Sequence, residues 1–457
     1  MSNQPKQVEQ ANVETRQVDT QQVETSQNKP ADPALYERIL DRVTLERSQP
    51  TDSPNQGLLG RLPWLQQLQT SGLIHPIAAF FITRLIIFAA AYIAEIALPG
   101  NVGEGYWHAA PQNILIDMWA RWDSAFYISI INEGYQYSVT SRANVAFFPV
   151  YPLMVDLVNI IIQNTLISGI LVSNACLLAA LIYFYKLTEF EFGDRDTARR
   201  AVYYIASFPT AFYFSAIYTE STFLLMIVAT MYYTRRHEWG MAVLFGILTA
   251  ASRIIGVVAW GLVMLEWMHV QGWSIGTMYR PRAWVGLFRG LLKDWVTVLL
   301  IALIPLGLFS YMVFLYNEFR DPVAFMTVQA AWGRTNLASG LGFIRDINGL
   351  IGQNFWTGEI WWHVVVDSAA FFGAMATVYA IWRRLGEHYA LYVLLSLLPP
   401  AGSGTQSLTR YVIVLFPIFM ILAWWGREQT VDHLLTTTFT VFLGVFTAIF
   451  VNWVFLA

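Results

Sequence analysis

The chain has 457 residues, of which 56% are hydrophobic, 15% are aromatic and only 13% are charged. Because soluble proteins carry about 25% charged residues, this composition excludes an ordinary soluble domain and predicts an integral membrane protein. The formal net charge of −3 does not predict orientation, which depends on where lysine and arginine lie, and no nucleic-acid partner is expected. Cys176 is the single cysteine, so an intramolecular disulfide is excluded.

The first 74 residues differ in character from the rest of the chain. Residues 1–30 are polar and lack the apolar core of a cleavable signal peptide, and we expect them to be disordered. Residues 34–74 mix apolar and charged residues and are interrupted by prolines. We therefore predict that residues 1–74 form a cytoplasmic, largely disordered tail with an amphipathic segment. One transmembrane domain is predicted to follow over residues 75–457.

A series of apolar runs follows, and each is a candidate for a transmembrane helix, which needs about 20 apolar residues. The arginine-rich connections between them are expected to face the cytoplasm. These connections lie near residues 195–200, 235–236, 280–293 and 383–384. The candidate spans cover residues 75–97, 166–188, 200–217, 219–235, 240–270, 295–316, 361–382, 388–402, 410–426 and 433–456.

Placing all four connections on the cytoplasmic side requires two further features. Segment 146–164 is apolar but carries Asp156, and it must stay on the outer side as an interfacial or re-entrant helix. Segment 240–270 must contain two short helices that meet near Arg253. The result is an all-α polytopic membrane bundle of about ten or eleven transmembrane segments, with the amino terminus in the cytoplasm.

The outer loops that result cover residues 98–165 and 317–360. In the first loop, Asp123 lies beside Trp122 and close to Arg121. Aromatic rings suit the headgroup level of a membrane, so one interpretation is an interfacial helix with a solvated acid. The other is a catalytic carboxylate that acts as a general base. Residue types alone leave both interpretations open.

Several charged residues lie inside or beside apolar runs, where they mark ion pairs or a polar pathway. Arg84 lies in the middle of the first run, and we expect it to form a structural ion pair or to extend its guanidinium toward the membrane surface by snorkelling. Arg253 and Arg410 are placed near the outer face, where a forked guanidinium matches a phosphate. A structural ion pair with Glu220 is the alternative for Arg253.

The second outer loop brings together an amide, an indole and a guanidinium at near-helical spacing, in Gln329, Trp332 and Arg334. Such groups bind sugars by stacking and hydrogen bonding, although an interfacial helix would have the same composition. The sequence contains no zincin motif and no phosphate-binding glycine loop. Its histidines are scattered, so a transition-metal site lacks support and no metal is expected.

A set of short motifs recurs in order along residues 75–430. These are Trp122-Asp123, Tyr127-Ile128, Glu133-Gly134-Tyr135, Ala146 to Leu153, Ser207 to Ser221, Ala251 to Gly256, Asp321 to Arg334, and Thr409-Arg410-Tyr411 with Phe416-Pro417. Together they resemble the PIG-V family, the second mannosyltransferase of glycosylphosphatidylinositol-anchor assembly and its prokaryotic relatives. Eukaryotic members usually carry histidine near the position of Tyr127, so the likeness is to the prokaryotic members.

The resemblance implies a fold of the GT-C glycosyltransferase type, with interfacial helices and the catalytic acid in the first outer loop. The implied donor is a polyprenyl-phosphate sugar such as dolichyl or undecaprenyl phosphomannose, and no cofactor is required. The implied partners are membrane lipids, this donor, and a glycan or glycolipid acceptor. The implied location is multi-pass in a bacterial plasma membrane, or in the endoplasmic reticulum membrane of a eukaryote.

We therefore predict inverting transfer of a hexose, mannose by resemblance, with Asp123 as the general base. The donor phosphate is expected to contact Arg253, Arg410 and Tyr411. Further substrate contacts are expected from Arg121, Trp122, Tyr127, Glu133, Glu220, Gln329, Trp332 and Arg334. Whether Glu133 or Asp117 shares the base role stays open. The alternative functions are a non-enzymatic lipid or solute transporter or flippase, and a scaffold subunit with a degenerate site.

Overall fold

The computed structural model describes residues 63–98, 107–333, 341–351 and 362–454. Contacts divide the chain into two units, Met1–Gln66 and Gln67–Ala457. The expectations for the amino-terminal tail fall almost entirely outside the described residues. The second unit carries every feature discussed below.

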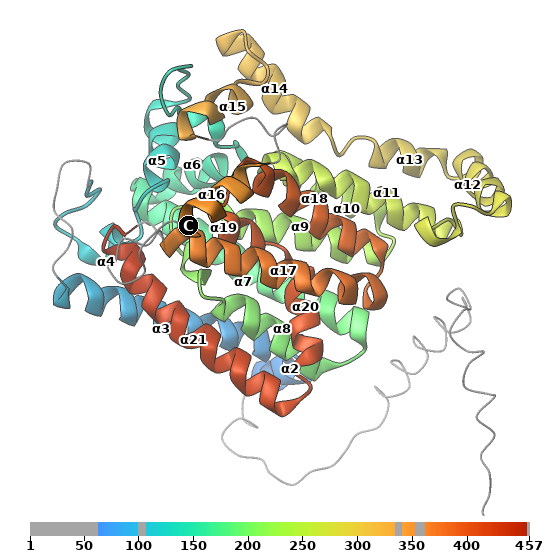
Figure 1. Cartoon of the computed structure of the whole chain (residues 1–457), viewed down its shortest axis with the longest axis horizontal. Helices are drawn as coiled ribbons and strands as arrows, with labels where there is room; N and C mark the ends of the chain where they lie inside the picture. Colours follow the sequence, from blue (N-terminus) through green and yellow to red (C-terminus); the bar gives the residue numbers. More distant parts are fainter. Residues whose placement is uncertain (1–62, 99–106, 334–340, 352–361, 455–457) are drawn as a thin grey trace, which may run out of the picture. The chain divides into compact units, whose positions relative to one another are not determined.

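The described residues form helices joined by loops, with no strand among them, which confirms the predicted all-α class (Figure 1). The main helices are α3 (Ile74–Ala97), α7 (Thr165–Phe192), α8 (Arg195–Ser207), α9 (Glu220–Arg235), α10 (Trp239–Ala250), α11 (Val258–Val270), α12 (Pro281–Lys293), α13 (Trp295–Ile301), α14 (Leu306–Phe319), α17 (Trp362–Arg384), α18 (Glu387–Ser403), α20 (Phe416–Trp425) and α21 (Gln429–Val451). The shorter elements are α2 (Pro63–Thr70), α4 (Ile114–Asp117), α5 (Ser124–Glu133), α6 (Val150–Ile162), α15 (Ala324–Thr327), α16 (Gly342–Ile351), α19 (Leu408–Val412), and the 3₁₀ turns η4 (Asn144–Ala146), η5 (Ala211–Phe214), η6 (Ile254–Val257), η7 (Ile275–Thr277) and η8 (Val328–Trp332).

Four helices in the described part of the chain are long and apolar enough to cross a membrane, and α13 with α14 forms a fifth candidate bent by 44°. The four are α3, α7, α17 and α21. Large apolar side chains on the outside, such as Leu85 at 72% exposed and Ile161 at 82% exposed, are what a lipid-facing surface requires. The chain is therefore a membrane protein, while the predicted number of ten or eleven crossings stays a prediction.

Packing is organised around α7, which contacts α8, α9 and α6, while α9 also contacts α10. Helix α21 runs beside α3. The turn between α7 and α8 shows how local sequence sets this arrangement. Gly193 ends α7 with a left-handed φ of 62°, and Asp194 then caps α8 by accepting from the N–H groups of Asp196 and Thr197. Two antiparallel helices are thereby joined by a very short connection.

The predicted interruption near Arg253 is present. Helix α10 ends at Ala250, and α11 begins at Val258 after the turn η6. Gly256 makes this turn possible, because a Cβ atom there would lie 1.9 Å from the carbonyl oxygen of Thr249. The absence of a side chain therefore lets the chain fold back on α10 and leaves Arg253 in an extended segment with φ −157° and ψ 154°.

The segment predicted to be interfacial forms α6, a helix of 13 residues. At 1.5 Å per residue it is about 20 Å long, which is shorter than the roughly 30 Å hydrocarbon core. Its partners are α5 and α7, and Leu157 and Ile161 are exposed. This geometry suits a helix that lies at the membrane surface beside α5.

Arg84, the buried arginine of α3, has a structural role. Arg84 is 5% exposed and donates to the carbonyl oxygens of Ala206 and Ala211 and to the hydroxyl of Ser215. These acceptors lie where the chain leaves α8 and turns toward α9. Arg84 thus satisfies backbone carbonyls at a helix break inside the bundle, in place of the expected ion pair or snorkelling.

Candidate active site

Four charged side chains form one continuous chain of ion pairs at the place where several helices are interrupted. Nη1 of Arg410 lies 2.5 Å from Oδ2 of Asp123, and Nε of Arg410 lies 2.9 Å from Oε1 of Glu220. The same Oε1 atom lies 3.1 Å from Nη1 of Arg253. The order is therefore Asp123, Arg410, Glu220, Arg253, with two negative and two positive charges.

Burial increases from one end of this chain toward its middle. The Asp123 side chain is 26% exposed and Arg410 is 11% exposed, whereas Glu220 is fully buried. A buried carboxylate is tolerated only when it is paired and hydrogen-bonded, and here two arginines share it. Oε2 of Glu220 is buried and has no hydrogen-bond partner among the described residues.

The side chain of Asp123 does not cap the helix that follows it, α5. Asp123 is the N-cap residue of α5, yet its side chain makes no capping hydrogen bond, although aspartate in that position normally accepts from the first turn and contributes about 1 kcal/mol. The carboxylate turns to Arg410 instead. The preceding residue, Trp122, adopts a left-handed φ of 51°, an unusual conformation for a bulky residue.

Tyr218 fixes the backbone at the same point. Its hydroxyl accepts from the N–H of Asp123 at 3.1 Å and donates to the carbonyl of Arg121 at 3.1 Å. Its ring also lies under the guanidinium of Arg410, 4.7 Å from centroid to Cζ, as in a cation–π contact. Tyr411 stands in the same relation to Arg253, at 5.2 Å. Aromatic residues therefore position the backbone of Asp123 and the side chains of both arginines.

The loop predicted to be the second outer loop reaches the predicted first one through aromatic contacts. The ring of Trp332 lies 5.6 Å from that of Phe126 and 6.3 Å from that of Phe147. The hydroxyl of Tyr137 donates to Asp321 at 2.6 Å. As a result, α15 and η8 cover the first loop at the end of α5 that carries Asp123.

The family model described as Mannosyltransferase (PIG-V) matches residues 94–359. The chain belongs to this family. The match contains Asp123, Glu220 and Arg253, and it confirms the resemblance based on the ordered motifs. Because the PIG-V family is a family of glycosyltransferases, the match supports glycosyl transfer as the activity of this chain. The match ends before Arg410.

Two solved structures of the oligosaccharyltransferase from Archaeoglobus fulgidus are similar in outline. The first is a crystal structure of the apo form, with 14% identity, a TM-score of 0.39, and coverage of 83% of this chain and 55% of that chain. The second, AglB in complex with an inhibitory peptide and a dolichol-phosphate, has 12% identity, a TM-score of 0.37, and coverage of 82% and 55%. The chain thus spans about half the length of these proteins. No curated protein matches the sequence.

Two residues expected near the site belong to a separate cluster in this PIG-V family protein. Arg121 is 1% exposed, and its guanidinium donates to Asp117, to Glu95 at 2.5 Å and to the carbonyl of Val451 at 2.9 Å. All three of its nitrogen atoms are therefore engaged inside the protein. These bonds tie α4 to α3 and to the end of α21, and the expected contact of Arg121 with substrate stays a prediction.

Asp117 is committed to the same cluster. Burial raises its pKa, but the N–H of Ala110, His108 and Arg121 outweigh this effect and hold the pKa of Asp117 below its ordinary value. The carboxylate is 4% exposed and its oxygens are bonded to these three groups. This arrangement favours a structural role for Asp117, in which it holds Arg121 and His108 in place, over a role in proton transfer.

Glu133 lies at the other end of the helix that begins after Asp123. It is the last residue of α5, and ten residues of helix separate the two carboxylates by about 15 Å. Glu133 is exposed and accepts from the side chain of Gln136 at 2.9 Å. The structure therefore does not bring Glu133 to the site, contrary to the expectation from the sequence.

The remaining residues that were predicted to contact substrate make contacts within the protein or lie outside the described residues. Tyr127 is 2% exposed and packs against Phe147 and Tyr151, while the half-buried ring of Trp122 lies 5.5 Å from that of Trp453. The amide of Gln329 donates to the carbonyl of Phe325 at 3.0 Å. Arg334 lies outside the described residues.

Two acidic residues that the sequence reasoning missed shape the loop in front of Arg410. Asp367 on α17 is fully buried and accepts from the N–H groups of Ser407 and Thr409 at 3.0 and 2.8 Å, and from the Thr409 hydroxyl. Asp346 on α16 accepts from the N–H of Thr405 at 2.8 Å. An acid within an apolar run was the available signal for Asp367.

We expect Asp367→Asn to destabilise the protein by about 1.5–3 kcal/mol, because hydrogen bonds to a buried charge are lost. We also expect slower sugar transfer, since Arg410 follows the loop that Asp367 holds. Thermal unfolding in detergent and transfer rates measure both effects. Ser368→Ala is the matched control on the neighbouring position of α17, and equal unfolding temperatures for the two variants would contradict the role of Asp367.

Proposed function

We propose that this family member transfers a hexose, mannose by family, from a polyprenyl-phosphate donor to a hydroxyl of a lipid-linked or cell-surface glycan at the extracytoplasmic face. The observation that carries the proposal is the partly exposed carboxylate of Asp123, which forgoes helix capping and is fixed by Arg410 and Tyr218. The family supports glycosyl transfer in general. The sugar, the donor, the acceptor and the side of the membrane are parts of the proposal.

In the proposed reaction, Asp123 removes the proton from the acceptor hydroxyl. Arg410 contacts Oδ2, which leaves Oδ1 to accept this proton. The acceptor oxygen forms a bond to the anomeric carbon while the bond from that carbon to the phosphate oxygen breaks, so the configuration inverts. The lipid phosphate leaves with the electron pair, and no acid is needed because phosphate is a good leaving group.

Arg253 and Arg410 are the groups proposed to receive the phosphate. Among the described residues, Nη2 of Arg410 and both Nε and Nη2 of Arg253 have no hydrogen-bond acceptor. Donors fixed in advance near a developing negative charge stabilise the transition state without reorganisation. Glu220 keeps the two guanidinium groups together before the donor arrives, so the structural ion pair and the phosphate site are compatible.

Incubation of the purified protein with labelled polyprenyl-phosphomannose and membrane lipid extract tests the function. We expect labelled mannose to appear on an acceptor and free polyprenyl phosphate to be released. Movement of the donor across vesicle membranes without release of phosphate would instead support the transporter alternative. Absence of both would contradict the enzyme and the transporter together and favour a scaffold.

We expect Arg253→Gln to lower the transfer rate on the order of 10²-fold, as for other losses of a transition-state donor. Arg253 contacts Glu220 but not Asp123, so this variant leaves the proposed base and its Arg410 partner in place. Arg142→Gln, in an exposed part of the first outer loop, is the matched control. Equal single-turnover rates for the two variants would remove Arg253 from the phosphate site.

A further inference from the structure

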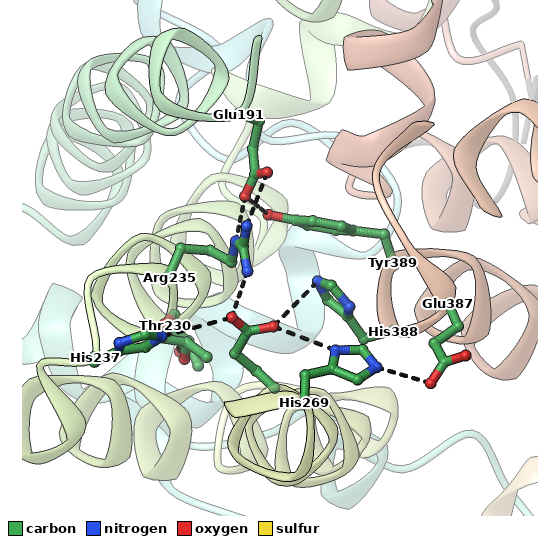
Figure 2. A network of polar contacts seen from close by, with 10 residues as sticks. Glu191, Thr230, Arg235, His237, His269, Glu387, His388 and Tyr389 are labelled. Carbon is green, nitrogen blue, oxygen red and sulfur yellow. Dashed lines mark hydrogen bonds and ion pairs between the residues drawn. The ribbon is translucent and has the colours of Figure 1, made fainter. Parts of the chain in front are cut away.

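A second polar cluster lies where α7, α9, α11 and α18 meet. Figure 2 shows the side chains of this cluster pointing toward one another from these four helices. Glu220 and Arg235 are the first and last residues of α9, so the cluster is about 22 Å from the candidate active site. Its members are Glu191, Arg235, Glu266, His269, Glu387 and His388.

Three side chains in this cluster offer a carboxylate oxygen and two imidazole nitrogens to one point. Oε2 of Glu266 lies 3.6 Å from Nδ1 of His269 and 3.9 Å from Nε2 of His388. The three ligand atoms all lie within 4.8 Å of one another. Glu266 and His269 share one face of α11 because they are three residues apart, and His388 comes from α18.

His388 provides an independent observation that points to a ligand. Its side chain is 4% exposed, and neither ring nitrogen has a hydrogen-bond partner among the described residues. Oε2 of Glu266 is likewise buried without one. Buried polar groups are normally hydrogen-bonded, and leaving them unsatisfied destabilises the folded state. A ligand between these atoms would satisfy them.

The surrounding residues orient the two ligands on α11. Nε2 of His269 lies 2.8 Å from Oε1 of Glu387, and that oxygen also accepts from the N–H of Ile275 at 2.7 Å. Metal-binding histidines typically donate their second N–H to a carboxylate in this way, which turns the other nitrogen toward the metal. On the other ligand, Arg235 binds Oε1 of Glu266 and leaves Oε2 toward the histidines.

The charges of the cluster call for a further cation. Glu191 and Glu266 are paired with Arg235, and Glu387 is paired with His269, so Arg235 is the single arginine in the cluster. With neutral imidazoles, two negative charges stay uncompensated in a largely buried place. A dication would neutralise them, and buried charges need such compensation.

We propose that Glu266, His269 and His388 bind a transition-metal dication, Zn²⁺ being the ion that best suits two imidazoles and one carboxylate. Zinc bonds of about 2.0–2.1 Å in tetrahedral geometry place ligand atoms roughly 3.3 Å apart. Small side-chain rotations from the present separations reach this value. The ion would join α11 to α18.

Zinc binding by the full chain in detergent tests this proposal, with purification through a tag that contains no histidine. After chelator treatment and dialysis, Zn²⁺ alone is titrated, and bound metal and unfolding temperature are measured. We expect one ion per chain and an unfolding temperature that rises with Zn²⁺ concentration, since a ligand of the folded state stabilises it. His388→Asn is expected to lose both effects.

Two further variants separate this site from nonspecific binding. Glu387→Gln should weaken zinc binding about 10–100-fold through loss of the partner of His269. His433→Asn removes a histidine from α21 and should retain wild-type binding. Equal binding by His388→Asn and His433→Asn would overturn the proposal, as would a wild-type protein whose stability responds to pH but not to Zn²⁺.

A spectroscopic measurement keeps the test decisive if His388→Asn does not fold. Co²⁺ added to the metal-free wild-type protein should give visible absorption bands of a four-coordinate site, and one equivalent of Zn²⁺ should abolish them. Cys176, the single cysteine, is buried, so thiolate bands are not expected. A spectrum equal to that of Co²⁺ in buffer would overturn the proposal.

Discussion

Asp123→Asn is expected to lower the rate of sugar transfer about 10²–10⁴-fold, the usual contribution of a general base. The amide has nearly the same shape and can still accept from Arg410, but it cannot take the proton of the acceptor hydroxyl. Because the Asp123 side chain makes no capping bond to α5, the substitution should leave the fold and the unfolding temperature nearly unchanged.

Single-turnover transfer with labelled donor measures this effect without interference from product release. Asp156→Asn is the matched control, because Asp156 is an exposed acid on α6 within the same predicted outer loop. A transfer rate for Asp123→Asn within a few fold of the rate of the control would contradict the assignment of Asp123 as the general base. Loss of activity together with loss of the folded state would show that Asp123 has a structural role instead.

Glu220→Ala is expected to have the largest effect on stability. Glu220 is fully buried and pairs with Arg253 and Arg410, which are 13% and 11% exposed. Removing one partner of buried ion pairs costs about 3–5 kcal/mol, because here two arginines are left near each other without their carboxylate. Transfer activity should fall as well, since Arg410 would lose one of its two anchors.

Thermal unfolding in detergent tests this prediction, with Glu220→Gln as the conservative variant. Glutamine keeps the shape and one acceptor oxygen but not the charge. We expect it to unfold between the wild type and Glu220→Ala if charge pairing stabilises the site. An alanine variant as stable as the wild type would show that the arginines are solvated or paired elsewhere, and the chain of ion pairs would then have no energetic role.

The positions of the helices were largely predictable from the sequence. Apolar runs of sufficient length anticipated most main helices of the described region, and the charge rule anticipated the interruption near Arg253 and the short helix at 146–164. Helix α12 was not anticipated, because it lies in a predicted arginine-rich connection, and the predicted span 200–217 is interrupted after Ser207, where α8 ends. Both signals are local, because a helix satisfies its own backbone hydrogen bonds within one segment. The candidate base could also be predicted from the sequence, since Asp123 lies in a motif within the region that the family model matches.

Contacts between distant segments were not predictable in the same way. The sequence placed Arg121 and Glu133 close to Asp123 along the chain. The loop between α4 and α5 turns Arg121 into the protein, and helix α5 carries Glu133 about 15 Å away. Conversely, Asp367 reaches the loop before Arg410 only because α17 packs against α19. Adjacency in sequence does not give the direction of a side chain.

The sequence by itself therefore determined the membrane class, the helical segments, the family and the candidate base of this protein. Only the tertiary structure decided which charges meet. It joined Asp123, Arg410, Glu220 and Arg253 into one chain of ion pairs, and it brought His388 to Glu266 and His269, although the histidines had looked scattered. The physical reason is that helices form from local hydrogen bonds and hydrophobic length, whereas a site forms where helices distant in sequence pack against one another.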